Sequence, residues 1–254
     1  MNDDITSSLA TLQTDAPDEV IERVLVGTGS LDYFTAISWR HGTLWVSWNG
    51  HGVSCVAPGQ HPDAFFASHD AKVGRELRSA NSMPPRLLDM IENTLETGVI
   101  GGLPIDLRGV ADFQREVLMS IQAIPPGELR TYAWVAHQMG KPKAARAVGS
   151  ALNRNPVPVL IPCHRVGRSD GSVGQYAFGP AMKRQLLHDE GLDVGRLDSY
   201  VDRNIRYLGS KNYDAYCFPS CRTGKRMLDV NRAEFRDRAA AEAAGYRPCK
   251  VCKP

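Results

Sequence analysis

The chain has 254 residues, 43% of them hydrophobic, so it is long enough to bury a core as one large domain or as about two to three small ones. Its 30 basic and 28 acidic residues give a formal net charge of +2, too balanced for the whole chain to act as a polycation on nucleic acid. No apolar run approaches the roughly 20 residues that span a bilayer, and the polar, acidic start lacks the features of a signal peptide. We therefore expect a cytoplasmic protein, nucleoid-associated if bacterial, with no membrane partner.

The first part of the chain predicts a tail and a small α+β domain. Residues 1–19 are small and polar without an apolar stripe, which predicts a disordered tail. From 24 to 56, β-branched and aromatic residues alternate with polar ones between two turn pairs, His-Gly and Asn-Gly, which predicts a meander of antiparallel strands. Apolar residues at helical spacing over 87–95 predict a helix, and a short strand-like segment follows at 103–107. We assign this domain to residues 20–108.

The next block, residues 109–193, is mainly helical and has a helix-turn-helix outline. A helix that begins near Asp112 is stopped by Pro-Pro-Gly at 125–127. Thr131 is placed to cap a helix that runs through Met139, a turn follows, and residues 143–153 predict a second helix. An ordinary helical hairpin packed tightly on a neighbour is the alternative interpretation of the same pattern.

The second of these helices has a small-residue surface. Small side chains let a helix backbone approach a phosphate chain or a groove floor closely. They are Ala144, Ala145, Ala147, Gly149 and Ala151. Its exposed side also offers Arg146, Ser150 and Arg154, which suits contact with DNA.

A proline-punctuated apolar run leads directly into Cys163, which is followed by His164 and Arg165. Neighbouring cations lower the pKa of a thiol and raise its reactive fraction, so Cys163 is a candidate nucleophile. A small buried core cysteine is the alternative.

Five ordered motifs surround this cysteine. They are Pro-Lys-Ala-Ala-Arg-Ala-Val-Gly at 142–149, Asn-Pro-Val-Pro at 155–158, Ile-Pro-Cys-His-Arg-Val at 161–166, Gly-Ser-Val-Gly at 171–174 and Leu-Leu-His-Asp-Glu-Gly at 186–191. With them, the chain from about Leu103 to Leu192 resembles the O6-alkylguanine-DNA alkyltransferase (methylated-DNA–protein-cysteine S-methyltransferase) family. The resemblance implies direct-reversal DNA repair: a stoichiometric, suicide enzyme moves the alkyl group from O6-methylguanine, and from O4-methylthymine, in double-stranded DNA to Cys163.

The resemblance also implies a catalytic set. Cys163 would accept the alkyl group, His164 would take its proton through a water, and Glu190 would orient His164. Asn155 would brace the active-site turn, and Tyr132 would protonate the leaving base at N3. A Cys-His-Glu relay follows the logic of a Ser-His-Asp triad with sulfur as the nucleophile, and the transfer needs no cofactor.

DNA contacts follow from the same resemblance. Because O6 lies inside the duplex, the nucleotide must rotate out, and Arg146 would fill the stack while the recognition helix lies in the minor groove. The implied DNA-binding residues are Arg146, Ala144, Ala145, Ala147, Gly149, Ser150 and Arg165. The implied pocket residues are Tyr176, Ala177, Phe178 and Val166. Relatives have glycine or tryptophan where Phe178 stands, so we expect its ring to obstruct bulky adducts.

The implied fold class is α+β. Residues 20–108 resemble the family's ribonuclease-H-like N-terminal domain, and residues 109–193 its winged-helix-like catalytic domain. Residues 194–206 lose periodicity and predict a linker. A monomer is expected.

The tail at 207–254 carries two close cysteine pairs, Cys217-x3-Cys221 and Cys249-x2-Cys252. Four thiolates at this spacing predict a Zn²⁺ site, with disulfides as the alternative. A helix is expected from 234 to 244. The tail resembles the Ada-type metal-binding domain, in which the first zinc cysteine also accepts methyl groups from DNA phosphotriesters. Cys217 occupies that position, but the module is shortened at its front, so it is either a second acceptor or a structural element.

Two binding functions remain as alternatives. Alkyltransferase-like proteins bind lesions without catalysis, but they have another residue in place of the acceptor cysteine, so Cys163 argues against this class. A zinc-dependent DNA-binding regulator is the other, although no long recognition helix follows the zinc ligands.

Overall fold

The structure is a computed structural model that describes residues 16–254, so most of the expected tail, residues 1–15, lies outside the described residues. The described part begins with helix α2, Asp18–Thr28, where strands had been expected from residue 24. Two acidic residues in its first turn favour the helix dipole, and Gly29 closes it in the left-handed conformation at φ 67°. These signals at the two ends explain why the segment forms a helix and not a strand.

The N-terminal sheet confirms the expected antiparallel meander. Strands β1 (Leu31–Trp39), β2 (Gly42–Asn49) and β3 (Gly52–Pro58) pair antiparallel, and β4 (Glu76–Ser79) pairs parallel to β1. The strand order is therefore β3-β2-β1-β4. Residues 103–107 form only an isolated bridge to β3 instead of a strand.

Two helices accompany this sheet. Helix α3 spans Asp63–Lys72, and α4 spans Pro85–Thr97, ending at Gly98 in the left-handed conformation as the sequence predicts. The sheet and α4 share one continuous apolar cluster with the helices that follow, in which Val46, Ile91 and Val148 are all fully buried. This common core holds the N-terminal sheet against the helices that follow.

Helices occur where the helix-turn-helix outline predicts them. Helix α5 spans Asp112–Ile121, α6 spans Tyr132–Gln138 and α7 spans Ala145–Asn153. Thr131 caps α6, since its hydroxyl accepts a hydrogen bond from the Trp134 amide over 3.0 Å.

The chain that follows forms a short turn, a strand pair and a further helix. A short 3-10 helix, η1 (Cys163–Arg165), leads into β6 (Val166–Gly167), which pairs parallel with β5 (Arg130–Thr131). Helix α8 spans Gly179–Asp189.

Helix α9, Val194–Asp202, lies where a linker had been expected, which corrects that expectation. Asp193 caps it through the Arg196 amide, and Val194 and Leu197 are buried in a cluster with Leu187 of α8. The helix has an apolar stripe, but it is too short for a periodic pattern to stand out in the sequence.

The C-terminal module is a second small sheet of order β10-β8-β7-β9. Its elements are β7 (Tyr207–Ser210), β8 (Ala215–Cys217), α10 (Arg222–Lys225), η2 (Asp229–Asn231), β9 (Arg232–Phe235), α11 (Arg238–Ala243) and β10 (Arg247–Pro248). The expected helix over 234–244 is therefore shorter: Asp237 caps α11 through the Ala240 amide, and the residues before it pair in β9.

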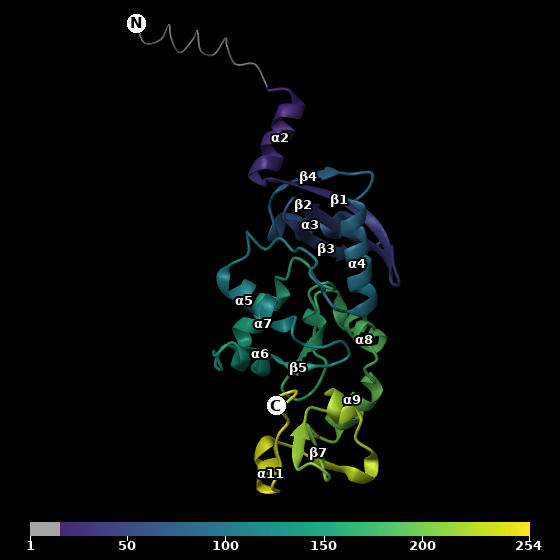
Figure 1. The fold of residues 1–254 in the computed structure, drawn as a ribbon, viewed down its shortest axis with the longest axis vertical. Coiled ribbons are helices and arrows are strands. Elements are labelled where there is room, and N and C mark those ends of the chain that lie inside the picture. Colours follow the sequence, from purple (N-terminus) through teal and green to yellow (C-terminus); the bar gives the residue numbers. More distant parts are fainter. Residues whose placement is uncertain (1–15) are drawn as a thin grey trace, which may run out of the picture.

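Figure 1 shows an elongated molecule, with the N-terminal sheet at one end, the helices around β5 in the middle and the C-terminal module at the other end. Within residues 16–254, no helix combines the length and apolarity that a bilayer span requires.

Candidate active site and metal centre

Cys163 lies buried at the start of η1, in a turn braced by Asn155. The Asn155 side-chain amide donates to Cys163 Sγ over 3.2 Å and to the Ile161 carbonyl over 3.3 Å, and its oxygen accepts from the Val157 amide over 3.0 Å. Val159 in the same turn has a φ of 74°, a costly conformation for a β-branched residue. The surrounding packing therefore holds this turn in a shape that it would not adopt alone.

His164 and Glu190 form a pair beside the cysteine, with side chains that are 2% and 12% exposed. His164 Nε2 lies 2.8 Å from Glu190 Oε1. With the ring proton on Nε2, Nδ1 is an acceptor, and it is buried without a hydrogen-bond partner among the described residues. Burial lowers the pKa of His164, against the effect of Glu190, so the ring is held neutral. A neutral imidazole with a free acceptor nitrogen is suited to act as a base.

Glu190 stays ionised in this environment. Burial alone would raise its pKa, but the hydrogen bonds from His164 and Arg165 lower the pKa to about 2. The carboxylate can therefore fix the orientation of the His164 ring.

Arg165 does not face DNA, which corrects the expectation for this residue. Its side chain is 3% exposed, and it donates to Glu190, to the Ile124 carbonyl and to the Gly98 carbonyl. Because its donors are used inside the protein, Arg165 holds the Glu190 carboxylate in place.

A cavity of 240 Å³ adjoins Cys163. It is lined by Tyr132, Gly149, Leu152, Asn153, Cys163, Gln175, Tyr176 and Ala177. The structure thus brings Tyr132, Tyr176 and Ala177 to the cysteine as the sequence predicts.

Two expected pocket residues do not line this cavity. Phe178 packs edge-on against Tyr176, with ring centroids 5.6 Å apart, and against the apolar cluster around Phe65 of the N-terminal domain. Val166 is fully buried in β6. Both are corrections: Phe178 packs on the N-terminal domain, and Val166 belongs to the main apolar core.

Both tyrosines of the cavity keep their phenolic protons. Burial raises the pKa of Tyr132, and the nearby Cys163 adds to the effect. The pKa of Tyr176 is raised well above its usual value by the same two causes. Each can serve as a hydrogen-bond donor to a bound base.

Two lysines that sequence reasoning missed lie close to the cysteine. Lys183 of α8 is buried and donates to the Val166 and Gln175 carbonyls over 2.6 and 3.1 Å. Burial lowers its pKa to about 8. Lys72 of α3 donates to the Asn155 carbonyl over 3.1 Å. An isolated lysine carries no local signal, and Lys72 comes from a different domain.

Helix α7 presents the expected polar surface. Arg146, Ala147 and Ser150 are exposed, while Ala144, Ala145 and Gly149 are half-buried. The Arg146 side chain has no hydrogen bond or ion pair within residues 16–254. It is free to contact a partner.

The four cysteines of the tail come together as predicted. The sulfurs of Cys217, Cys221, Cys249 and Cys252 lie within 4.8 Å of one another, and all four residues are buried. Hydrogen bonding among the four thiols lowers the pKa of Cys221 and raises the pKa of Cys217. The all-sulfur donor set fits tetrahedral Zn²⁺.

Two family models match this chain. Residues 112–192 match the one described as "6-O-methylguanine DNA methyltransferase, DNA binding domain", and residues 198–254 match "Metal binding domain of Ada". The chain joins these two domains. The family resemblance is thereby confirmed, and the cysteine cluster is the metal site of the Ada-type domain, which begins within α9.

Individual relatives agree with the domain matches. The regulatory protein ada of Salmonella typhimurium is 34% identical over 159 residues, which cover 62% of this chain and 45% of that protein. The methylated-DNA–protein-cysteine methyltransferase of Mus musculus is 50% identical over 86 residues, 33% of this chain and 41% of that protein. The chain thus spans less than half the length of these two relatives.

The fold has a solved counterpart. The crystal structure of Mycobacterium tuberculosis OGT in complex with DNA aligns with a TM-score of 0.51 and 28% identity, covering 63% of this chain and 93% of that one. The α+β class is confirmed.

Proposed function

We propose that the protein repairs DNA by direct reversal, transferring the alkyl group from O6 of guanine in double-stranded DNA, and from O4 of methylthymine, to Cys163. The observation that carries the proposal is the buried Cys163, which accepts a hydrogen bond from Asn155 beside a His164–Glu190 pair and opens on a cavity. The relatives named methylated-DNA–protein-cysteine methyltransferase support it.

The chemistry balances without a cofactor. Burial raises the pKa of the Cys163 thiol, so it must lose its proton at the moment of reaction, and His164 Nδ1 takes that proton through a water. The thiolate attacks the alkyl carbon, an S–C bond forms and the C–O bond to guanine breaks. The leaving guanine gains a proton, for which Tyr132 is the donor at N3. Because the thioether is stable, each molecule acts once.

Access to O6 requires the nucleotide to leave the stack, since the atom lies inside the duplex. Helix α7 exposes Ala147, with Ala144, Ala145 and Gly149 half-buried beside it and Ala151 fully buried, and its Arg146 is free to fill the vacated position. The similar Mycobacterium tuberculosis OGT is solved in complex with DNA, which supports DNA binding by this fold. Sequence preference should be weak, because the minor groove presents few distinguishing groups.

The finer fold assignments belong to the same proposal. Strand order β3-β2-β1-β4, with only β4 parallel, supports a ribonuclease-H-like N-terminal domain. The β5–β6 pair beside α6 and α7 supports a winged helix-turn-helix. The domain boundaries, the monomeric state and the cytoplasmic location stay predictions.

The test is the mass of the intact protein after incubation with a duplex that carries O6-methylguanine. We expect the mass of one methyl group added and mapped to Cys163, with no addition from the same duplex without the lesion. Cys163→Ala should abolish the addition and keep DNA binding. Lesion binding without any methyl addition would instead favour the non-catalytic class.

Methylphosphotriester repair at Cys217 is the second candidate activity. Cys217 is fully buried among the other three cysteines, with Phe218 and Met227 packed around the cluster. This burial favours a structural ligand over a second acceptor.

A further inference from the structure

One segment of the chain, residues 127–131, lies between the Cys163 site and the C-terminal module; we call it the bridging segment. On one side, its Arg130 and Thr131 pair in parallel with Val166 and Gly167, which directly follow η1. On its other side, it contacts residues 220–225, which we call the zinc loop because they include Cys221 together with the short helix α10.

The bridging segment holds the carboxylate of Glu190. The Gly127 amide donates to Glu190 Oε2 over 2.9 Å, while Oε1 of the same carboxylate accepts from His164. Gly127 has a φ of 69°, and a Cβ at this position would lie 2.3 Å from the Glu190 carbonyl oxygen. Only glycine fits so close to Glu190, so the position of the bridging segment fixes the carboxylate.

The zinc loop forms hydrogen bonds with three consecutive residues of the bridging segment. Lys225 Nζ donates to the Gly127 carbonyl over 3.2 Å, and the Arg222 amide donates to Glu128 Oε1 over 3.1 Å. The buried Ser220 hydroxyl both accepts from the Leu129 amide and donates to the Leu129 carbonyl, each over 2.9 Å.

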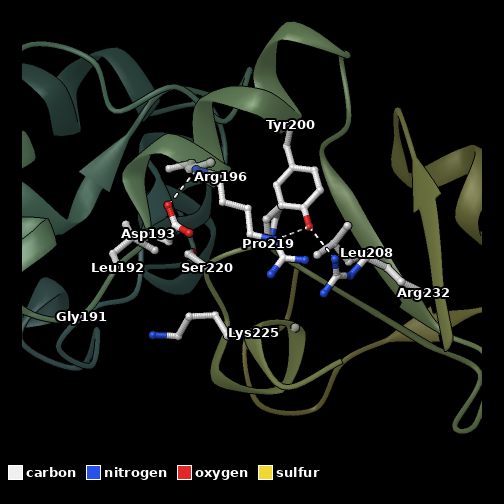
Figure 2. A pocket seen from close by; sticks show the side chains of 12 residues that line it. Gly191, Leu192, Asp193, Arg196, Tyr200, Leu208, Pro219, Ser220, Lys225 and Arg232 are labelled. Carbon is white, nitrogen blue, oxygen red and sulfur yellow. Dashed lines mark hydrogen bonds between the residues drawn. The ribbon is translucent and has the colours of Figure 1, made fainter. Parts of the chain in front are cut away.

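A small cavity of 140 Å³ lies where the zinc loop meets the chain next to Glu190. In Figure 2 the Lys225 side chain extends away from Arg196 and Arg232 and toward the side on which Gly191 lies, next to Glu190 in the chain. Lys225 thus reaches from the zinc loop to the edge of the catalytic site.

Aromatic and main-chain contacts complete the interface. The Arg130 guanidinium lies over the rings of Trp134 and Phe218, at 5.5 and 5.6 Å from their centroids. Trp134 Nε1 donates to the carbonyl of Cys252, itself one of the four metal ligands, over 2.8 Å. The metal site is thereby tied to the catalytic domain at both cysteine pairs.

We propose that the metal-loaded zinc loop positions Glu190, through the bridging segment, for its hydrogen bond to His164. This inference rests on the proposed alkyl transfer. The cluster around the sulfurs contains few apolar side chains besides Phe218 and Met227, so the conformation of the loop depends on the metal. Ser220 and Lys225 are positioning residues, because they act on His164 only through the bridging segment and Glu190. Loss of the metal therefore lowers transfer at a site that contains no metal ligand.

The first test compares Ser220→Ala and Lys225→Met with Lys211→Met, which removes an exposed lysine of the same module that does not contact the bridging segment. Loss of one hydrogen bond here should slow methyl transfer about fivefold in each of the first two variants. Zinc content and affinity for undamaged duplex should not change, and Lys225→Arg should recover most of the rate. Full transfer rates in both variants, or in zinc-stripped wild-type protein, would overturn the inference.

The second test measures the effect of Glu190 on the metal site, and its readout does not require methyl transfer. We expect Glu190→Gln to release zinc to a chelator about threefold faster than wild-type protein, because the bridging segment is held less firmly. Glu116→Gln, an exposed glutamate on α5, is the matched control. Equal release from both variants would overturn the inference, whereas a wild-type protein that fails to transfer methyl would refute only the proposed function.

Discussion

The Asn155 side-chain amide donates to Cys163 Sγ over 3.2 Å, and both residues are buried. Burial raises the pKa of the thiol, and the hydrogen bond from Asn155 acts in the opposite direction, as does the charge of Lys183. The nucleophile is thus protected as a thiol and stabilised once it becomes a thiolate.

Asn155→Ala should therefore slow transfer about tenfold, through the loss of this donor and of the braced turn. It should also lower the free energy of unfolding by about 2 kcal/mol, since buried partners lose their hydrogen bonds. Single-turnover kinetics and denaturant unfolding measure the two effects. Transfer at the wild-type rate would show that Asn155 does not stabilise the thiolate.

Stability should depend on pH through Glu190. Its pKa falls from an ordinary 4.5 to about 2 in the folded protein, so the stabilisation is fully present above pH 4.5 and is lost as pH falls toward 2. The difference in unfolding free energy between wild type and Glu190→Gln should shrink by about 3 kcal/mol over that interval. Denaturant unfolding at a series of pH values measures it, and a constant difference would contradict the assignment.

Arg146→Ala should reduce lesion processing more than duplex binding, because the side chain is exposed on α7 and fills the stack only when the base rotates out. Arg154→Ala, at the end of the same helix, is the control for lost charge. Transfer rates and binding to undamaged duplex are compared for both variants. Equal losses in the two assays for Arg146→Ala would argue against its role in base rotation.

The variant Phe178→Ala tests whether this side chain lies outside the substrate pocket. Because its ring packs on Tyr176 and the cluster around Phe65, Phe178→Ala should cost about 2 kcal/mol of stability. It should not widen access for O6-benzylguanine, in contrast to the obstruction expected from the sequence. Thermal unfolding and the rate of inactivation by O6-benzylguanine check both points. Much faster inactivation of Phe178→Ala than of the wild-type protein would show that Phe178 lines the pocket.

Zinc should bind with a stoichiometry of one through the four tail cysteines, and Cys249→Ser should abolish it. Peptide mapping after exposure to DNA with methylphosphotriesters but no O6 lesion should find Cys217 unmodified, since its side chain is fully buried. A methyl group on Cys217 would instead make the protein bifunctional.

The sequence by itself determined the features that depend on local spacing. The alternation of strand residues, the Thr131 cap, the motifs around Cys163 and the two cysteine pairs each act over a few residues of chain, so periodicity and spacing reveal them. The family motifs also predicted roles for His164 and Glu190, and the structure places His164 Nε2 2.8 Å from Glu190 Oε1.

Only the tertiary structure decided what distant segments do to one another. Arg165 follows the nucleophile in a motif that suggests a DNA contact, but three separate segments supply its acceptors and remove it from the surface. Phe178 packs on the N-terminal domain, and Lys72 of α3 donates a hydrogen bond to the Asn155 carbonyl. The sequence predicts a linker before the tail, but Ser220 and Lys225 form hydrogen bonds with the segment that holds Glu190. Such contacts depend on how complementary surfaces pack, which no local pattern encodes.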